Sequence, residues 1–215
     1  MAFGKSQRQN KIKYFALTIA LLAISMVYRD NADPIVSEKI KPLLELRTEE
    51  LSNGDIIFRT GRDLVSSLVL TQGDAAQFSH VGVILKQEEK ISVVHSLPED
   101  TNSASGVQVE ALTAFTSFDN ASNFAVYRLK GIDSKVRSKV TEYILQQVGK
   151  PFDADFLLST DDRMYCTELV VKAFSIAGVE LTANVKAIKI MLIDELVIPP
   201  DHLRQSHLLR RLSLI

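Results

Sequence analysis

One cysteine and two histidines are the residues of this chain best suited to nucleophilic chemistry. Cys166, the one cysteine, stands at the start of a helix that we predict over residues 165–177. The partial positive charge at a helix N-terminus favours a thiolate, and unpaired backbone N–H groups there can receive an oxyanion. The same cysteine lines up with the apolar face of that helix, and a lone cysteine on such a face usually serves packing. That face is formed by Leu169, Val170, Ala173, Phe174 and Ala177. Catalysis is therefore favoured over packing only if a base lies near the sulfur.

The two histidines are predicted to lie together at one end of a sheet. His80 begins the strand HVGVI and His95 ends the next strand, with a charged hairpin loop at residues 87–90 between them. The open ends of a hairpin lie side by side, so the two imidazoles could serve one thiol as base and orienting group. Gly82, on the same face as His80, leaves room for another chain or a substrate to approach. A polar strand end facing water explains either histidine alone, and metal binding requires that both meet the cysteine as ligands.

Strands and helices that alternate along the chain must position these residues. Apolar and β-branched runs predict strands over residues 55–59, 79–86, 91–95, 107–110 and 123–129. Apolar residues at helical spacing predict helices over residues 35–51, 61–70, 134–148, 165–177 and 184–196. Strands that cluster between helices with short connections predict an α+β fold, with an antiparallel, barrel-like sheet packed against helices.

The composition excludes several classes of protein. Of 215 residues, 46% are hydrophobic and 24% charged, which is typical of a globular protein and not of a disordered, collagen-like or polytopic membrane chain. The 25 basic and 26 acidic residues give a net charge of −1, so no basic excess favours nucleic-acid binding. A single cysteine excludes an intrachain disulfide, and no cluster has the spacing of zinc ligands.

The N-terminal 33 residues are typical of an export signal or a membrane anchor. Four basic residues precede an uncharged run over residues 14–28, and no acidic residue occurs before Asp30. The run is short for a spanning helix, which needs about 20 residues. A buried N-terminal helix is a third interpretation, disfavoured because the run has no polar face. Both export interpretations place the rest of the chain outside the cytoplasm. We divide that part into a connecting helix at residues 34–50 and a domain at residues 51–215.

Four segments together resemble a known family. They are LSNGDIIFRTG at residues 51–61, FSHVGVIL at 78–85, GKPFD at 149–153 and MYCTELV at 164–170. In this order they resemble the circularly permuted NlpC-type papain-like cysteine hydrolases of the YiiX/YaeF-like group, over roughly residues 51–182. The pair HVGVI…VVHS is also similar to the lecithin-retinol-acyltransferase-like branch. The resemblance implies a permuted papain-like fold with a cysteine nucleophile, a histidine base and a third polar residue that orients the base. We expect neither a metal nor a cofactor.

The family's roles can be carried over residue by residue. Cys166 matches the nucleophile and His80 the base. The YiiX-like relatives are expected to have a carboxylate or another polar residue in the third position, where this sequence offers His95, with Glu99 close behind. We choose His95, because its strand is predicted to pair directly with that of His80.

Other polar residues near these segments have simpler interpretations. Asp55 is expected to be structural and to hold a loop at the mouth of the site, and Tyr165 lines either the oxyanion region or the core. Asp153 and Asp155 are interpreted as loop organisers or substrate contacts, with plain solvation as the alternative. Glu168 is interpreted as an acid in the first turn of the helix that favours its dipole.

Three functions fit these observations. The first is an extracytoplasmic cysteine amidase or peptidase, with a cell-wall peptide as substrate. The second is a thiol acyl hydrolase or acyltransferase that acts on lipids, favoured by the N-terminal segment and by four apolar residues near the site, Phe152, Phe156, Leu157 and Leu158. The third is a non-catalytic domain in which Cys166 is merely buried. The first two share a thioester intermediate, so the sequence does not separate them by mechanism.

Overall fold

The computed structural model describes residues 47–61, 76–98, 105–189 and 195–213. These residues all belong to one compact unit, Leu46–Ile215. The predicted export segment, the helix at 61–70 apart from Gly61, and Glu99 lie outside the described residues, as does most of the helix at 35–51. Near the end of that predicted helix, a short 3-10 helix, η2 (Thr48–Glu50), is present. Within the described part of the chain, no helix has the length and apolar character that crossing a membrane requires.

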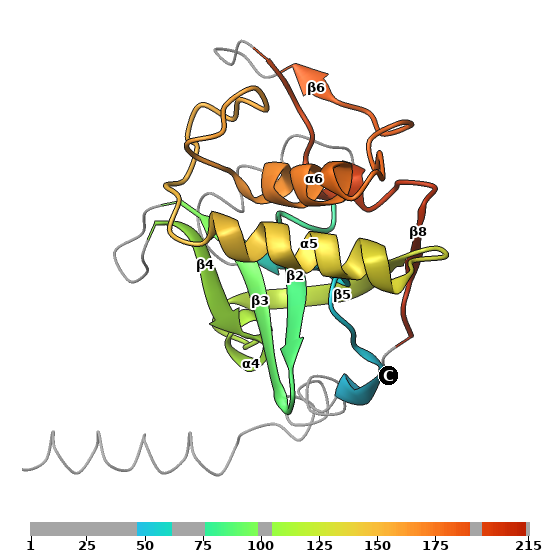
Figure 1. Cartoon of the computed structure of the whole chain (residues 1–215). Helices are drawn as coiled ribbons and strands as arrows, with labels where there is room; N and C mark the ends of the chain where they lie inside the picture. Colours follow the sequence, from blue (N-terminus) through green and yellow to red (C-terminus); the bar gives the residue numbers. More distant parts are fainter. Residues whose placement is uncertain (1–46, 62–75, 99–104, 190–194, 214–215) are drawn as a thin grey trace, which may run out of the picture. The chain divides into compact units, whose positions relative to one another are not determined.

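A six-stranded antiparallel sheet forms the centre of the unit, in the order β4-β3-β2-β1-β5-β8. Its strands are β1 (Ile56–Gly61), β2 (His80–Gln87), β3 (Lys90–Leu97), β4 (Gly106–Ala111), β5 (Ala121–Leu129) and β8 (Leu209–Arg211). The five strands predicted from the sequence are all present, with ends that differ by up to two residues. With helices against this sheet, the predicted α+β class is confirmed (Figure 1).

Each face of the sheet has its own hydrophobic core, because alternate residues of a strand point to opposite faces. The larger core joins one face to the helices α5 (Ser134–Gln147) and α6 (Cys166–Ile176), which lie side by side in Figure 1. Phe58, Val81 and Val94 are among its fully buried members. The smaller core lies on the opposite face, where Ile57 and Ile84 pack with the short helix α4 (Leu112–Phe115). Neighbouring residues of one strand are thereby assigned to different cores.

The two long helices begin and end where the sequence indicates. The side chain of Asp133 caps α5 by accepting a hydrogen bond from the backbone N–H of Val136 at 2.8 Å. Past the helix ends, Gly149 and Gly178 have φ values of +93° and +84°, which glycine adopts without strain. The predicted helices at 134–148 and 165–177 are therefore confirmed to within one residue at each end.

The helix predicted over residues 184–196 is wrong for the residues described there, 184–189 and 195–196, and residues 190–194 lie outside the described part of the chain. Residues 181–184 form turns, and two short strands, β6 (Ile188–Lys189) and β7 (Leu196–Val197), pair antiparallel instead. Leu196, which a helical face would have buried, is 55% exposed, whereas Val197 and Ile198 are buried. Pro200 then opens a short helix, α7 (Pro200–Leu203), in the first turn, where its missing N–H is not needed.

Candidate active site

His80 and His95 contact each other directly, as the hairpin predicted. The β2–β3 ladder pairs Gly82 with His95, and Nε2 of His80 lies 2.8 Å from Nδ1 of His95. The two rings meet edge to face and both contact the ring of Phe115, with centroids 5.8 Å and 5.2 Å away. His80 is 6% exposed and His95 is fully buried. The pair is thus a closely packed unit and not two polar strand ends facing water.

Gly82 gives His95 the space that this pairing needs. A Cβ atom on Gly82 would lie 2.5 Å from Cγ1 of Val93 and 3.0 Å from both the carbonyl oxygen of Val94 and Cβ of His95. These distances are far below ordinary van der Waals contact. The space that the sequence analysis assigned to another chain or a substrate is therefore occupied by the neighbouring strand β3.

Cys166 lies at the first residue of α6, close to the point where the β2–β3 ladder ends. The ladder stops at Gly82 and His95, and beyond it the hydroxyl of Ser96 donates to the carbonyl of Met164 at 2.6 Å. The backbone N–H of Val81 donates toward the sulfur of Cys166. The segment before α6 is thereby fixed against β3, and the sulfur contacts the residue directly after His80.

The contacts of the sulfur itself are few. Its side-chain partner is the hydroxyl of Thr167, 3.9 Å away, and the cysteine is partly exposed. Among the contacts between described residues, no hydrogen bond joins the sulfur to His80 or His95. Catalytic hydrogen bonds are often long before substrate binds. The structure therefore brings the two imidazoles together and places the thiol at the backbone of Val81, the residue after His80, without a bond to either ring.

The local electrostatics favour a neutral thiol and a neutral imidazole. Burial raises the pKa of Cys166, and this outweighs hydrogen bonds from Thr167 and Val81 that favour the thiolate. Burial also holds the pKa of His80 well below 6.5, with smaller contributions from the charges of Arg59 and His95. The helix N-terminus was expected to favour a thiolate at Cys166. Desolvation is the larger effect, because the sulfur packs against the core.

Two charged residues that no motif of the sequence singled out lie beside the histidine pair. Nε2 of His95 lies 3.3 Å from Oε2 of Glu110, and Nη1 of Arg59 lies 3.5 Å from the same oxygen. Arg59 is 5% exposed and its guanidinium lies 4.4 Å from the ring centroid of Phe115. The alternation of VQVE predicted a half-buried strand, but only the β3–β4 register, which pairs Val93 with Glu110, brings that carboxylate to His95.

The start of α6 is fixed by Glu168, which is fully buried two residues after the nucleophile candidate. Its Oε2 accepts a hydrogen bond from the backbone N–H of Tyr165 at 3.1 Å, and its Oε1 lies 2.9 Å from Nζ of Lys172. Burial raises the pKa of Glu168 to about 7 in spite of Lys172. Glu168 therefore stands in the first turn, as interpreted, and stabilises the helix start by its hydrogen bond to the backbone N–H of Tyr165. Because its pKa is raised, a full negative charge toward the helix dipole does not follow from this geometry. Tyr165 is 2% exposed, with its ring against that of Phe156, so its side chain belongs to the core.

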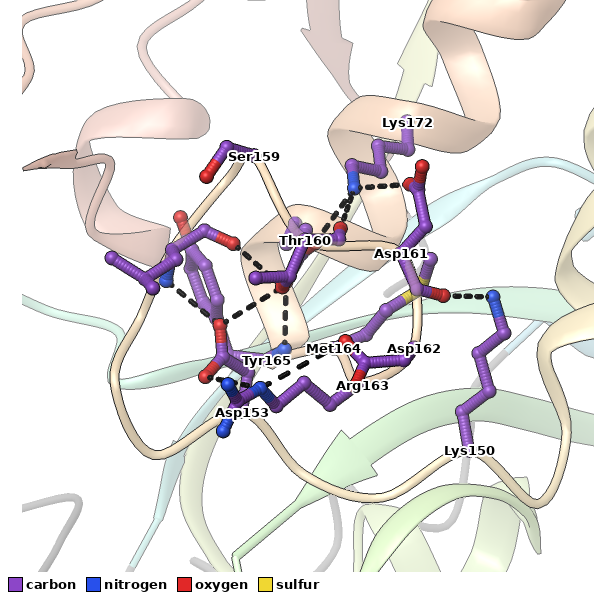
Figure 2. Close-up of polar contacts among 12 residues, drawn as sticks. Lys150, Asp153, Ser159, Thr160, Asp161, Asp162, Arg163, Met164, Tyr165 and Lys172 are labelled. Carbon is purple, nitrogen blue, oxygen red and sulfur yellow. Dashed lines mark hydrogen bonds and ion pairs between the residues drawn. The ribbon is translucent and has the colours of Figure 1, made fainter.

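Asp153 organises the loop that leads to Cys166. Figure 2 shows its carboxylate inside the loop, where it accepts hydrogen bonds from the backbone N–H groups of Asp155 at 3.0 Å and Leu157 at 2.7 Å. Arg163 lies 3.7 Å from the same carboxylate and 3.1 Å from that of Asp155. Lys172 connects this loop to α6 through Asp161, at 2.7 Å. Asp153 and Asp155 are therefore loop organisers, as one interpretation of the sequence had them.

Asp55 is structural, but it does not lie at the mouth of this site. It is fully buried, and both of its carboxylate oxygens accept hydrogen bonds from Arg128 at 2.7 Å. Its carbonyl accepts from the backbone N–H of Ile84 at 2.8 Å. Ile84 is four residues along β2 from His80, or roughly 13 Å at the rise of a strand. The expected position of Asp55 is therefore wrong, because Arg128 of β5 draws the carboxylate to the other end of the sheet.

Aromatic side chains pack against one another in the loop before α6. The rings of Phe152 and Phe156 meet edge to face with centroids 5.8 Å apart, and Phe156 lies 5.3 Å from Tyr165. Phe156 has a φ of +54°, which is unusual for a residue with a side chain. Within the described ranges, no three His, Cys, Asp or Glu side chains are grouped so that they could hold a metal ion.

Comparisons with known proteins agree with the fold and the motifs. Residues 50–202 match the family described as permuted papain-like amidase enzymes, YaeF/YiiX, C92 family. The uncharacterized protein YiiX of Escherichia coli (strain K12) is 26% identical over 122 residues, which are 56% of this chain and 56% of that relative. The crystal structure of metalloprotein yiiX from Escherichia coli O157:H7 has a similar fold, with a TM-score of 0.63 and 20% identity. That similarity covers 76% of this chain and 97% of the solved one. Because the family match extends over most of the chain, this protein belongs to the permuted papain-like amidases of the YaeF/YiiX family.

Proposed function

We propose that this protein is a cysteine amidase in which Cys166 is the nucleophile, His80 the base and His95 the residue that orients the base. One observation carries the proposal. The sulfur of Cys166 contacts the backbone of Val81, directly after His80, whose Nε2 is already bonded to His95 at 2.8 Å. His80 therefore keeps Nδ1 as the ring nitrogen that can exchange a proton with the thiol.

The reaction begins from the neutral pair. As Sγ of Cys166 attacks the amide carbonyl, its proton passes to Nδ1 of His80 and the carbonyl oxygen becomes an oxyanion. Backbone N–H groups in the first turn of α6 are available to stabilise that oxyanion. The C–N bond breaks, the amine leaves with the proton from His80, and an acyl thioester remains. Water, deprotonated by His80, then hydrolyses the thioester and restores the thiol.

The substrate class follows from the predicted location of the domain. Four basic residues and then an uncharged run over residues 14–28 support export from the cytoplasm, either anchored or released after cleavage of a signal. Amide bonds of cell-wall peptides are the substrates we propose in that compartment. When fused after Ile215, a reporter enzyme that works only outside the cytoplasm should be active. Activity of a reporter that works only in the cytoplasm would overturn this part of the proposal.

An acyl ester of a lipid is the second candidate substrate. Phe152 and Phe156, whose rings meet edge to face in the loop before α6, favour it because apolar side chains suit an acyl chain. Both substrates pass through the same thioester. Parallel assays with a stem-peptide amide and a long-chain acyl ester decide between them.

The test of the proposed mechanism compares three variants on whichever substrate the wild type cleaves. Cys166→Ser should abolish turnover, and His80→Ala should lose nearly all of it. His95→Ala should leave measurable turnover, because an unoriented base still adopts the productive tautomer part of the time. The matched control is His207→Ala, which should be fully active. The ring of His207 is hydrogen-bonded to Asn184 at the exposed surface. Substantial turnover by Cys166→Ser would overturn the cysteine mechanism, and a non-catalytic domain would turn over neither substrate.

A further inference from the structure

Four charged or titratable side chains from four neighbouring strands meet on one face of the sheet. Arg59 of β1 is paired with His80 of β2, and His95 of β3 follows, with Glu110 of β4 at the end of the row. Phe115 of α4 covers them, and its carbonyl accepts a hydrogen bond from Nη1 of Arg59 at 3.2 Å. The proposed mechanism uses only the two histidines and leaves Arg59 and Glu110 without a role.

Glu110, at the end of this row, determines which ring nitrogens of the two histidines donate hydrogen bonds and which accept them. Nε2 of His95 is buried and lies 3.3 Å from Oε2 of Glu110, and at this separation neither atom completes a hydrogen bond within the described part of the chain. The carboxylate oxygen is nevertheless positioned as an acceptor for a proton on this nitrogen. An ionised carboxylate can only accept, so Nε2 of His95 carries the proton. A neutral His95 then has an unprotonated Nδ1, which must accept from Nε2–H of His80 at 2.8 Å. Nδ1 of His80 is consequently unprotonated.

We propose that Glu110, held by Arg59, is a positioning residue that sets both histidines in the Nε2–H tautomer and so leaves Nδ1 of His80 free to accept the proton of Cys166. The inference rests on the proposed function, in which that nitrogen is the base. When His80 becomes an imidazolium during the reaction, the negative charge of Glu110 also stabilises it through His95. Cys166 and Glu110 do not touch, so Glu110 acts only through the pair.

The surroundings of Glu110 keep it ionised and in place. Burial raises its pKa, but the contact with His95 and the charge of Arg59 outweigh burial, so the pKa is lowered overall. Arg59 and Glu110 are the charged groups that act on the two histidines. The guanidinium of Arg59 contacts Oε2 of Glu110 at 3.5 Å while it lies over Phe115. An arginine in this position anchors the carboxylate and lowers the pKa of both histidines.

Two variants separate the acceptor from the charge. Glu110→Gln can keep an oxygen toward His95 and Arg59, so the tautomers should be preserved without the charge. The side chain of Glu110→Met has a similar length but no hydrogen-bond acceptor, so it should no longer fix His80 and His95 in the Nε2–H tautomer. Glu110 is at the sheet edge with its side chain 23% exposed, so both variants are expected to fold. Glu142→Met, on the exposed surface of α5, is the control.

The main measurement is ¹⁵N NMR of the histidine rings in the full-length protein, which reports the tautomers without any substrate. The wild type and Glu110→Gln should show Nε2–H for His80 and His95, whereas Glu110→Met should show a population with Nδ1–H. A carboxylate that touches the base directly is worth about 10⁴-fold in turnover. With His95 between them, we expect Glu110→Met to lose on the order of 100-fold and Glu110→Gln less than about tenfold.

The outcomes distinguish this inference from the proposed function. Nδ1–H on His80 in the wild type, or unchanged tautomers in Glu110→Met, would overturn the role of Glu110 even if Cys166 and His80 prove essential for turnover. Conversely, loss of the proposed amidase mechanism would appear as an active Cys166→Ser, while the NMR spectra would still decide the tautomers. Equal turnover by Glu110→Met and Glu142→Met would also contradict the inference.

Discussion

The reactivity of the Cys166 thiol toward an alkylating agent, measured as a function of pH, tests the neutral resting state of the site. Only the thiolate reacts with iodoacetamide. Two descriptions of the site predict different curves. A thiolate–imidazolium pair would react at a nearly constant rate between the two pKa values, from mildly acidic to neutral pH. A neutral thiol beside a neutral imidazole would react faster by tenfold for each pH unit.

The structure favours the second curve, and its magnitude can be bounded. Burial raises the pKa of Cys166 above the ordinary 9.0 of a thiol, and burial also lowers the pKa of His80 from 6.5. A raised pKa means that the thiol keeps its proton to higher pH, and a lowered pKa means that the imidazole is already neutral at pH 7. Two pH units below 9.0, at most about one sulfur in 100 is a thiolate. The rate at pH 7 should therefore be about 1% of its plateau or less.

The assay measures the rate of carboxamidomethylation by mass spectrometry from pH 5 to 10, on the native protein and on the same protein in urea. Because the chain has a single cysteine, every modified molecule reports on Cys166. The native rate should rise throughout and remain below that of the unfolded chain at pH 7. A plateau between pH 5 and 7, lost in His80→Ala, would refute the neutral pair and restore the thiolate that the helix N-terminus was expected to favour.

Three further predictions concern the supports of the site. Gly82→Ala should destabilise the fold by about 1–3 kcal/mol in urea titrations and lower turnover, because its Cβ would lie 3.0 Å from Cβ of His95; unaltered turnover would contradict the importance of this spacing. Asp55→Leu should lower the free energy of unfolding by about 3 kcal/mol, because it removes the buried carboxylate that pairs with Arg128. Turnover per folded molecule should not change, and a loss of it would place Asp55 in the site. Glu168 keeps its proton up to about pH 7 in the folded state and releases it near 4.5 when unfolded, so the wild type loses stability across that window. The unfolding free energy of Glu168→Gln should therefore improve relative to wild type between pH 5 and 8, and a constant difference would show that the carboxyl ionises normally.

The hairpin of His80 and His95 could be predicted from sequence because its information is local. A charged turn between two apolar strands determines the pairing, and the pairing places both imidazoles at the open end. The helix at Cys166 is also local, with Glu168 three residues after Tyr165 and Gly178 just past its end. The apolar periodicity of residues 184–196 was equally local, yet it failed, because it does not include the contacts that bury Val197 and Ile198 instead.

The residues that complete the site could only be found in the tertiary structure. Glu110 reaches His95 through the β3–β4 register, and Arg59 joins them from two strands away, so no spacing along the chain relates the three. The state of Cys166 also depends on packing. The helix start favours a thiolate, but the core that forms around the sulfur removes water from it, and in a folded chain that loss of hydration is the larger contribution to its pKa.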